Sequence, residues 1–343
     1  MRTLVIGLNW LGDAVMALPA LHALRRRTRF DILSKPGVAP IYVLSGLVDQ
    51  VHLLHPGAAG VWRAARAARA AGYDQVYVMP RSVRAALTAW LAGIPRRIGL
   101  PGRARYGLLT EVVAPRRDQE RAHQQREYMT RMENDGDAAG PAEIWLTIPD
   151  TARREAQARL EALNPGGPWA FLFPGAARGA SKQWPKERFA EVGRRLIQSG
   201  GRVFVCGAGR ELGVCAWATA HIGAGAFNLA GETTLAELAA LLSCAKVVVA
   251  NDSGGMHLAA AVGAPVVAIF GLTDPAITGP LGKGHRILQA PGAARGRDVP
   301  RRSEAAARAL AAVSAASVAE AAIEIMGNVE PLTPSTYHLA PTT

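Results

Sequence analysis

The segment KVVVANDSGGMH, residues 246–257, carries the clearest indication of the fold. Its unbroken apolar run predicts a buried strand, and the small residues after it predict a tight turn into a helix. Such a helix begins with backbone N–H groups that lack acceptors, here those of Ser253, Gly254, Gly255 and Met256. These donors and the helix dipole favour a diphosphate.

Two side chains flank this turn. Asp252 is an odd neighbour for a phosphate and is better suited to accept hydrogen bonds from a sugar hydroxyl or to fix the turn. His257 has two interpretations, contact with a ligand or a helix residue satisfied within the fold. Both remain open on the sequence alone.

On both sides of this segment, short apolar runs alternate with Ala/Leu/Arg-rich helical stretches along the whole chain. The pattern predicts an α/β fold of two Rossmann-like, doubly wound domains that face each other across a cleft. Strands are expected at 3–6, 30–33, 51–54, 75–79, 169–173, 202–206, 246–250 and 266–270. Helices are expected at 13–27, 58–71, 83–92, 186–198, 234–243, 254–262 and about 313–325.

The run NPGGP at residues 164–168 is rich in chain-breaking residues and predicts the domain boundary. We therefore expect an N-terminal domain over 1–165, a C-terminal domain over 166–327 and an aperiodic tail over 328–343. The arginine-containing region 100–125 is expected to be rich in loops.

The first predicted strand leads into GLNWLGD, residues 7–13. Ligands of open parallel sheets bind beyond the carboxyl ends of the strands, where this segment is expected. Asp13 is either an ordinary helix cap or a carboxylate in the site. The spacing does not match G-x-G-x-x-G, so the ordinary dinucleotide fingerprint is absent.

Two further loops follow strands of the second series. In FPGAARGASKQWP, residues 173–185, Lys182, Ser181 and Arg178 are candidates for binding a phosphate, or else lie in a solvated loop. Trp184 is expected to support the next helix. Glu211, after Cys206, can bind ribose hydroxyls or simply favour a first helical turn.

Composition narrows the class of protein. The formal net charge of +12 favours anionic partners, but no nucleic-acid-binding motif accompanies it. The three cysteines show no metal-ligand spacing, and we expect no metal site. No apolar run approaches the roughly 18 residues of a membrane span, and the N-terminus does not read as a signal peptide, so a cytoplasmic protein is expected.

In this order, the segments resemble the ADP-heptose-dependent heptosyltransferases. The matching stretches, spread over roughly residues 1–284, are NWLGDAVM, AGIPRRIGL, RARYGLL, FPGA, SKQWP, NLAGET, NDSGGMHLAAA and PVVAIFG. The resemblance implies a GT-B architecture and transfer of heptose with inversion and without a required metal. The donor is ADP-heptose, no cofactor is implied, and the acceptor is the inner core of lipopolysaccharide.

The resemblance also implies roles for residues. Asp13 is the expected general base, Lys182 and Ser181 stabilise the departing diphosphate, and Asp252 lies near the heptose. Further donor contacts are expected from Glu211, Ser253, Gly254, Gly255, Met256 and His257. Basic groups of the first domain are expected to meet acceptor phosphates and carboxylates, namely Arg81, Arg84, Arg97, Arg103 and Arg105. Such an anionic, membrane-embedded acceptor gives the positive charge a purpose and allows peripheral contact with the inner membrane.

The sequence leaves alternatives open. The preferred acceptor ends in heptosyl-Kdo, as for the second heptosyltransferase of the pathway, but a Kdo acceptor shares every donor-side argument. Other classes are an NAD-dependent oxidoreductase and a non-catalytic nucleotide- or nucleic-acid-binding module. The segment APGAARGRDVPRR, residues 290–302, departs from many relatives, which carry a cysteine there.

Overall fold

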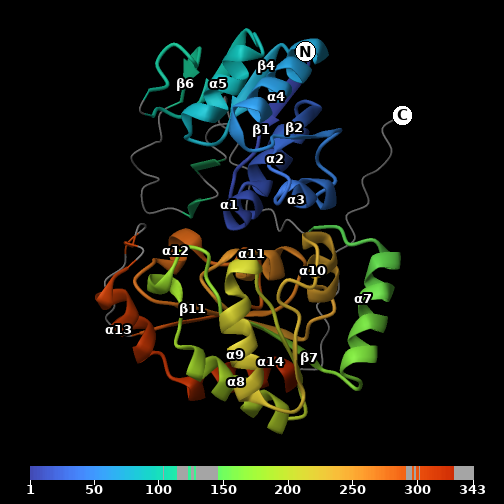
Figure 1. The fold of residues 1–343 in the computed structure, drawn as a ribbon, viewed down its shortest axis with the longest axis vertical. Helices are drawn as coiled ribbons and strands as arrows, with labels where there is room; N and C mark the ends of the chain where they lie inside the picture. The colour runs from blue at the N-terminus through green and yellow to red at the C-terminus, as the bar shows by residue number, and fades with distance from the viewer. Residues whose placement is uncertain are drawn as a thin grey trace.

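The computed structural model has two α/β lobes joined in one molecule (Figure 1). It describes residues 1–102, 104–113, 123–124, 127–128, 146–290, 296, 299–300 and 302–327. The predicted tail, residues 328–343, and most of the segment 290–302 lie outside the described residues.

Each lobe is built on a sheet that has six parallel strands in the described part of the chain. The first sheet has the order β3-β2-β1-β4-β5-β6. Its strands are β1 (Thr3–Ile6), β2 (Phe30–Ser34), β3 (Val51–Leu53), β4 (Gln75–Val78), β5 (Arg96–Gly99) and β6 (Glu111–Val112). The short strands β5 and β6 are additions to the predicted set.

The second sheet has the order β12-β11-β10-β7-β8-β9, which is the same winding when strands are counted within the lobe. Its strands are β7 (Trp169–Phe173), β8 (Arg202–Val205), β9 (Ala226–Asn228), β10 (Val247–Asn251), β11 (Val266–Phe270) and β12 (Arg286–Gln289). The two doubly wound lobes confirm the predicted fold class.

Helices cover both faces of each sheet. In the first lobe they are α1 (Leu11–Met16), α2 (Leu18–Arg25), α3 (Ala39–Leu44), α4 (Gly57–Ala71) and α5 (Val83–Leu91). In and beside the second lobe they are α7 (Asp150–Leu163), α8 (Lys186–Gln198), α9 (Leu212–Ile222), α10 (Leu235–Leu242), α11 (Gly254–Ala261), α12 (Pro275–Thr278), α13 (Glu304–Ala312) and α14 (Ala315–Gly327). Apolar residues of α1–α3 pack on one face of the first sheet, and those of α4 and α5 pack on the other.

The single helix predicted over residues 13–27 is wrong, because the chain forms α1 and α2 in its place. Pro19 is the second residue of α2 and has no backbone N–H, so an unbroken helix would lose a hydrogen bond there. The break leaves α1 as a short helix at the carboxyl end of β1, with Asp13 in its first turn.

The lobes touch through small residues. Helix α1 of the first lobe packs against α11 of the second. A Cβ added at Gly12 would lie 2.7 Å from Cδ2 of His257, and one at Gly254 would lie 3.0 Å from Cβ of Leu11. A methyl group at Gly12 would therefore force the two helices apart, and one at Gly254 would be tight against Leu11.

Helix α7 precedes the predicted boundary at residue 165 but packs against α10 and lies beside the second lobe (Figure 1). Just before it, the amide of Leu146 donates to the carbonyl of Ala261, and the amide of Thr147 donates to that of Leu44. A domain boundary ahead of α7 is therefore our proposal in place of residue 165.

No single helix within the described residues is long and apolar enough to cross a membrane. Helices α13 and α14 reach the length and apolar composition of a membrane span only when they are taken together, and the chain bends by 55° between them.

Candidate active site

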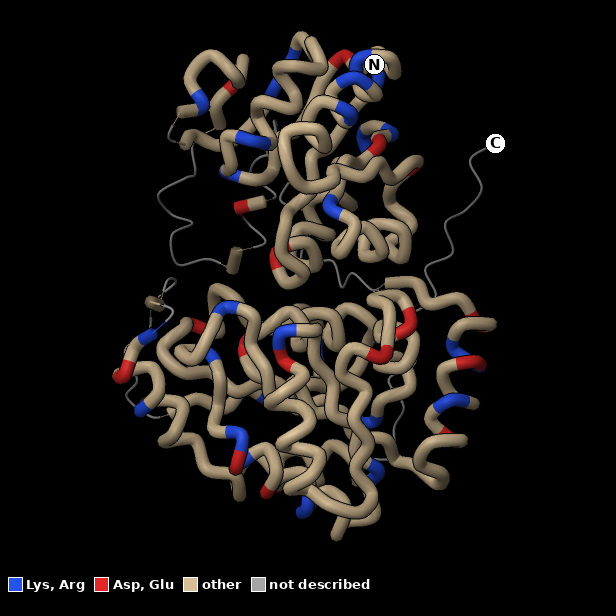
Figure 2. Tube along the Cα trace, in the orientation of Figure 1, with Lys and Arg blue, Asp and Glu red and all other residues tan. Residues whose placement is uncertain are grey.

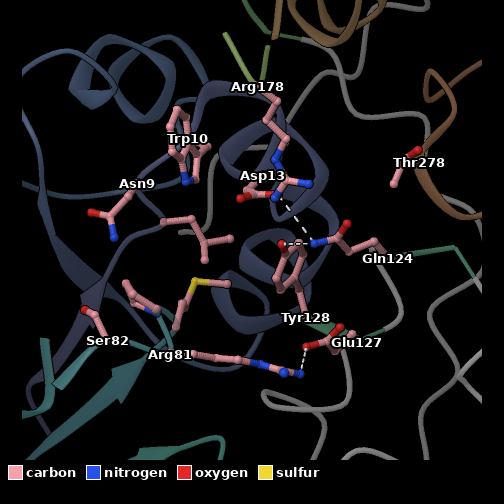
Figure 3. A pocket seen from close by; sticks show the side chains of 13 residues that line it. Asn9, Trp10, Asp13, Arg81, Ser82, Gln124, Glu127, Tyr128, Arg178 and Thr278 are labelled. Carbon is pink, nitrogen blue, oxygen red and sulfur yellow. Dashed lines mark hydrogen bonds and ion pairs between the residues drawn. The ribbon is translucent and has the colours of Figure 1, made fainter. Parts of the chain in front are cut away.

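Two cavities meet at Asp13, between the lobes. The larger is about 390 Å³ and the smaller about 130 Å³. The residues that line both are Trp10, Asp13, Gln124, Arg178 and Thr278. Because the two cavities share these residues, they form one continuous cleft, and Asp13 lies where they join. Figure 3 shows Asp13 among the residues that line the larger cavity.

Burial is the main influence on the Asp13 carboxylate. It raises the pKa of Asp13 above its ordinary value, while the charge of Arg178, a hydrogen bond from Tyr128 and the charge of Lys182 lower it in part. Figure 3 shows Arg178 reaching down beside Asp13 from the second lobe. A partly desolvated carboxylate with a raised pKa is suited to take up a proton.

Gln124 and Tyr128 hold this carboxylate in place. The Gln124 Nε2 donates to Oδ1 of Asp13 at 3.4 Å and to the Tyr128 hydroxyl oxygen at 2.6 Å (Figure 3). Sequence reasoning missed both residues. They follow no strand and belong to no glycine motif, so nothing local marks them as partners of a carboxylate 111 positions away.

Lys182 and Asp252 form a buried ion pair on the opposite side of the cleft. The distance from Lys182 Nζ to Asp252 Oδ2 is 2.5 Å, and the side chains are 10% and 5% exposed. Lys182 ends a short 3₁₀ turn, Ala180–Lys182, that also holds the buried Ser181, and Asp252 follows β10. The predicted anion-binding lysine is therefore brought to the predicted sugar-binding aspartate, which holds it at the edge of the smaller cavity.

Asn251 attaches the lysine loop to the end of β10. Its Nδ2 donates to the carbonyls of Pro174 and Gly175 at 3.0 and 3.1 Å, and its Oδ1 accepts from the Trp184 amide at 3.0 Å. Trp184 is buried and stacks edge-on against Phe189 of α8, which confirms its predicted supporting role. Asn251 lies in the segment KVVVANDSGGMH, but the sequence did not predict that it anchors the lysine loop, because its partners lie more than 60 residues away.

The N-terminus of α11 opens beside this pair. Ser253 is the N-cap, and the amides that follow, at Gly254, Gly255 and Met256, begin the helix. A Cβ at Gly255 would lie 2.5 Å from the ring of Phe173, so only glycine lets the turn sit this close to β7. Ser253 and Gly254 line the smaller cavity. The arrangement is a helix N-terminus suited to an anion.

His257 lies one turn further along α11. It is buried, its Nδ1 makes no hydrogen bond among the described residues, and burial lowers its pKa to about 4. The ring is therefore neutral near pH 7. It lines the smaller cavity and also contacts Gly12 across the lobe interface.

Glu211 lies at the start of α9. Its Oε2 accepts a hydrogen bond from the Ala208 amide at 2.7 Å, which is the helix-turn role considered from sequence. A Cβ added at Gly175 would lie 2.5 Å from Oε1 of Glu211, so the carboxylate is also packed against the loop that leads to Lys182.

The predicted acceptor arginines have different surroundings. Arg81 lines the larger cavity and pairs with Glu127 at 2.7 Å (Figure 3). Arg97 donates to the carbonyls of Leu108 and Ile94, and Arg84 donates to the carbonyl of His55.

Arg105 is buried against the backbone at Gly99 and Gly102, and Arg103 lies outside the described residues. Of the described members of the set, Arg81 alone lines the cleft.

Over the described ranges, no group of three or more His, Cys, Asp or Glu side chains could hold a metal ion. The cations that face the cleft from the second lobe are Arg178 and Lys182.

Comparison with known proteins identifies the family. The model of glycosyltransferase family 9 (heptosyltransferase) matches residues 61–304. Lipopolysaccharide heptosyltransferase 2 of Salmonella typhimurium is 31% identical over 84% of this chain and 88% of its own length. The Escherichia coli K12 protein of the same name is 30% identical over the same shares.

Solved structures agree with this. The structure of E. coli ADP-heptose lipopolysaccharide heptosyltransferase II superposes with a TM-score of 0.81 at 27% identity, covering 95% of this chain and 98% of that one. E. coli heptosyltransferase WaaC with ADP shares the fold at 22% identity and a TM-score of 0.68. The chain belongs to glycosyltransferase family 9, the heptosyltransferases, and is a GT-B glycosyltransferase.

Proposed function

We propose that this enzyme transfers heptose from ADP-heptose to a heptosyl-Kdo-lipid A acceptor during synthesis of the lipopolysaccharide inner core. The names of its relatives support the donor and the pathway, since the similar full-length proteins are lipopolysaccharide heptosyltransferases 2. Family membership favours transfer over the oxidoreductase and non-catalytic alternatives.

The observation that carries the proposal is the position of Asp13 at the junction of the two cavities. A hydroxyl held in the larger cavity can give its proton to Asp13 while it attacks a sugar held beside α11. Attack from the first lobe, with departure of the phosphate toward the second, inverts the anomeric carbon. The raised pKa of Asp13 fits the role of general base.

On the donor side, the diphosphate binds the N-terminal amides of α11 together with Lys182 and Ser181 of the 3₁₀ turn. Lys182 exchanges its partner Asp252 for the diphosphate, which frees the Asp252 carboxylate for heptose hydroxyls. Glu211 binds the ribose, and His257 supports the contact between the lobes. In this scheme, Lys182 and the helix amides stabilise the leaving-group charge that a divalent cation neutralises in other transferases.

On the acceptor side, Arg81 is our first candidate for acceptor phosphates or carboxylates, because it lines the larger cavity. Arg84, Arg97, Arg103 and Arg105 remain in the proposal as contributors to the positive field of this lobe or as supports of its loops. We place the enzyme in the cytoplasm, at the face of the inner membrane that carries the acceptor.

A transfer assay tests the proposal. Purified enzyme receives ADP-heptose and one of two truncated acceptors, ending in Kdo or in the first heptose, with and without EDTA. We expect transfer to the heptose-terminated acceptor at a rate that EDTA does not change. Transfer only to the Kdo-terminated acceptor would move the assignment to the first heptosyltransferase, and loss of rate with EDTA would contradict the metal-free mechanism.

A further inference from the structure

The outer face of the first lobe takes no part in the proposed transfer site. Helices α4 and α5 pack against each other on the same side of the first sheet (Figure 1). Their inward residues are mainly alanines within the hydrophobic core. Their exposed residues include Trp62, Arg63, Arg66, Val83 and Trp90, which we call the α4–α5 face.

The sequence that contains this face is strongly basic. Residues 51–110 contain nine arginines and a single acidic residue, Asp74. Blue segments lie over the α4 and α5 region in Figure 2. Arg63 and Arg66 are exposed, and neither makes a hydrogen bond or ion pair with any other described residue. Their charges are available to a partner.

The same face exposes large apolar side chains. Trp62 is 63% exposed and Trp90 49% exposed. A groove of about 300 Å³ runs along α4 and has a mixed lining. Its apolar residues include Leu4, Leu33, Leu53 and Ala64, and its polar residues are His52, His55, Arg63 and Tyr73. Indole rings beside free guanidinium groups are typical of surfaces that lie at the boundary between lipid headgroups and acyl chains.

We infer that the α4–α5 face docks on an anionic phospholipid bilayer. The arginines bind lipid phosphates, while the indoles and the groove accept the apolar zone beneath the headgroups. The apolar part of the groove beside Arg63 favours lipid over nucleic acid, because nucleic-acid interfaces are more polar and more positively charged than other protein interfaces. Ser82, the N-cap of α5, lines the larger cavity, so docking brings the cavity close to the bilayer. The docking itself does not depend on the proposed function. Only the suggestion that docking brings a lipid-linked acceptor to the cavity rests on it.

Vesicle sedimentation with the full-length protein and no substrates tests this inference. We expect wild-type protein to bind vesicles of phosphatidylcholine with 30% phosphatidylglycerol and to bind pure phosphatidylcholine at least tenfold more weakly. The double variant Arg63→Gln/Arg66→Gln should bind the anionic vesicles about 30-fold more weakly than wild type. Trp62→Ala should cause a smaller loss that persists at high salt.

The matched control is Arg154→Gln/Arg308→Gln, which removes the same charge from exposed positions on α7 and α13, beside and in the second lobe. We expect its vesicle binding to stay within twofold of wild type. Equal losses in the two double variants would overturn the inference, because net charge alone would then explain binding. Equal binding to both vesicle types would overturn it too, as would displacement from anionic vesicles by a short duplex DNA.

A second readout separates this inference from the proposed function. With a water-soluble acceptor that lacks lipid chains, Arg63→Gln/Arg66→Gln should transfer heptose at the wild-type rate. Absence of transfer in the wild type would count against the proposed function while leaving the vesicle result intact.

Discussion

The two lobes have the same strand order but present different chemistry to the cleft. From the first lobe, helix α1, which follows β1, carries Asp13, whose pKa is raised by burial. From the second, the loops after β7 and β10 deliver Lys182 and the N-terminal amides of α11. The fold alone therefore does not set the chemistry; the residues at the carboxyl ends of the strands do.

This difference divides the proposed reaction between the lobes. In the first lobe, the Asp13 carboxylate is suited to accept a proton. In the second lobe, Lys182 and the N–H groups of α11 are suited to stabilise a departing diphosphate. The glycines of α1 and α11 bring the halves together, since a side chain at Gly12 would meet His257. If the division is correct, substitutions in the two lobes should give distinguishable defects.

The largest expected effect is on turnover in Asp13→Asn. We expect a loss of about 1,000-fold, because the acceptor hydroxyl loses its proton acceptor. Folding raises the pKa of Asp13, so ionisation of this carboxylate costs stability as pH rises through the folded-state pKa. The amide avoids that cost, and the Tm at pH 7 should therefore match or exceed that of wild type. A lowered Tm would indicate a structural role for Asp13 and contradict its assignment as the proton acceptor of the first lobe.

Lys182→Gln should have the next largest effect, a loss of about 100-fold in kcat, because the diphosphate loses a buried positive partner. Lys186→Gln is a suitable control, since Lys186 lies over the Trp217 ring and lines neither cleft cavity. Steady-state kinetics with saturating acceptor measures both. If Lys182→Gln had the same kcat as Lys186→Gln, Lys182 would have no role in stabilising the departing diphosphate.

Gly12→Ala tests the contact between the lobes. The added methyl group meets the His257 ring at 2.7 Å, so α1 and α11 must move apart at a cost of about 1–3 kcal/mol. We expect a lower Tm and turnover reduced about tenfold. Gly213→Ala, with no atom within 4 Å of the added carbon, should leave both unchanged or slightly raise the Tm.

The smallest expected effect concerns pH. A hydrogen bond from Tyr128 lowers the pKa of Asp13, so Tyr128→Phe should raise that pKa. The acid limb of the kcat/KM profile should then move to higher pH by a fraction of a unit, with little change at alkaline pH. Tyr106→Phe, at a 96% exposed position, should leave the profile unchanged. A shift toward lower pH would contradict the arrangement around Asp13.

The sequence predicted the central strands and the loops after them because these carry strong local patterns. Buried runs such as residues 266–270 match β11 residue for residue. The strands β5, β6, β9 and β12 escaped prediction because they are short and only partly buried, which weakens their apolar pattern. The strand order, too, came from packing and not from any local pattern.

The site residues that directly follow strands were predictable from the sequence, and the others were not. Asp13, Lys182 and Asp252 follow strands, so topology brings them to one cleft. Gln124 and Tyr128 do not, and their contact with Asp13 depends on a long-range approach that no spacing encodes. The arginines were the least predictable, because an exposed guanidinium and one bound to carbonyls, such as that of Arg97, look alike in sequence.

The division of labour between the lobes is tested most directly by ADP affinity, measured by titration calorimetry on wild type, Asp13→Asn and Lys182→Gln. We predict that Asp13→Asn binds ADP within twofold of wild type although its turnover is lost, and that Lys182→Gln binds ADP about tenfold more weakly. The reverse result, with ADP binding lost in Asp13→Asn and kept in Lys182→Gln, would contradict the account.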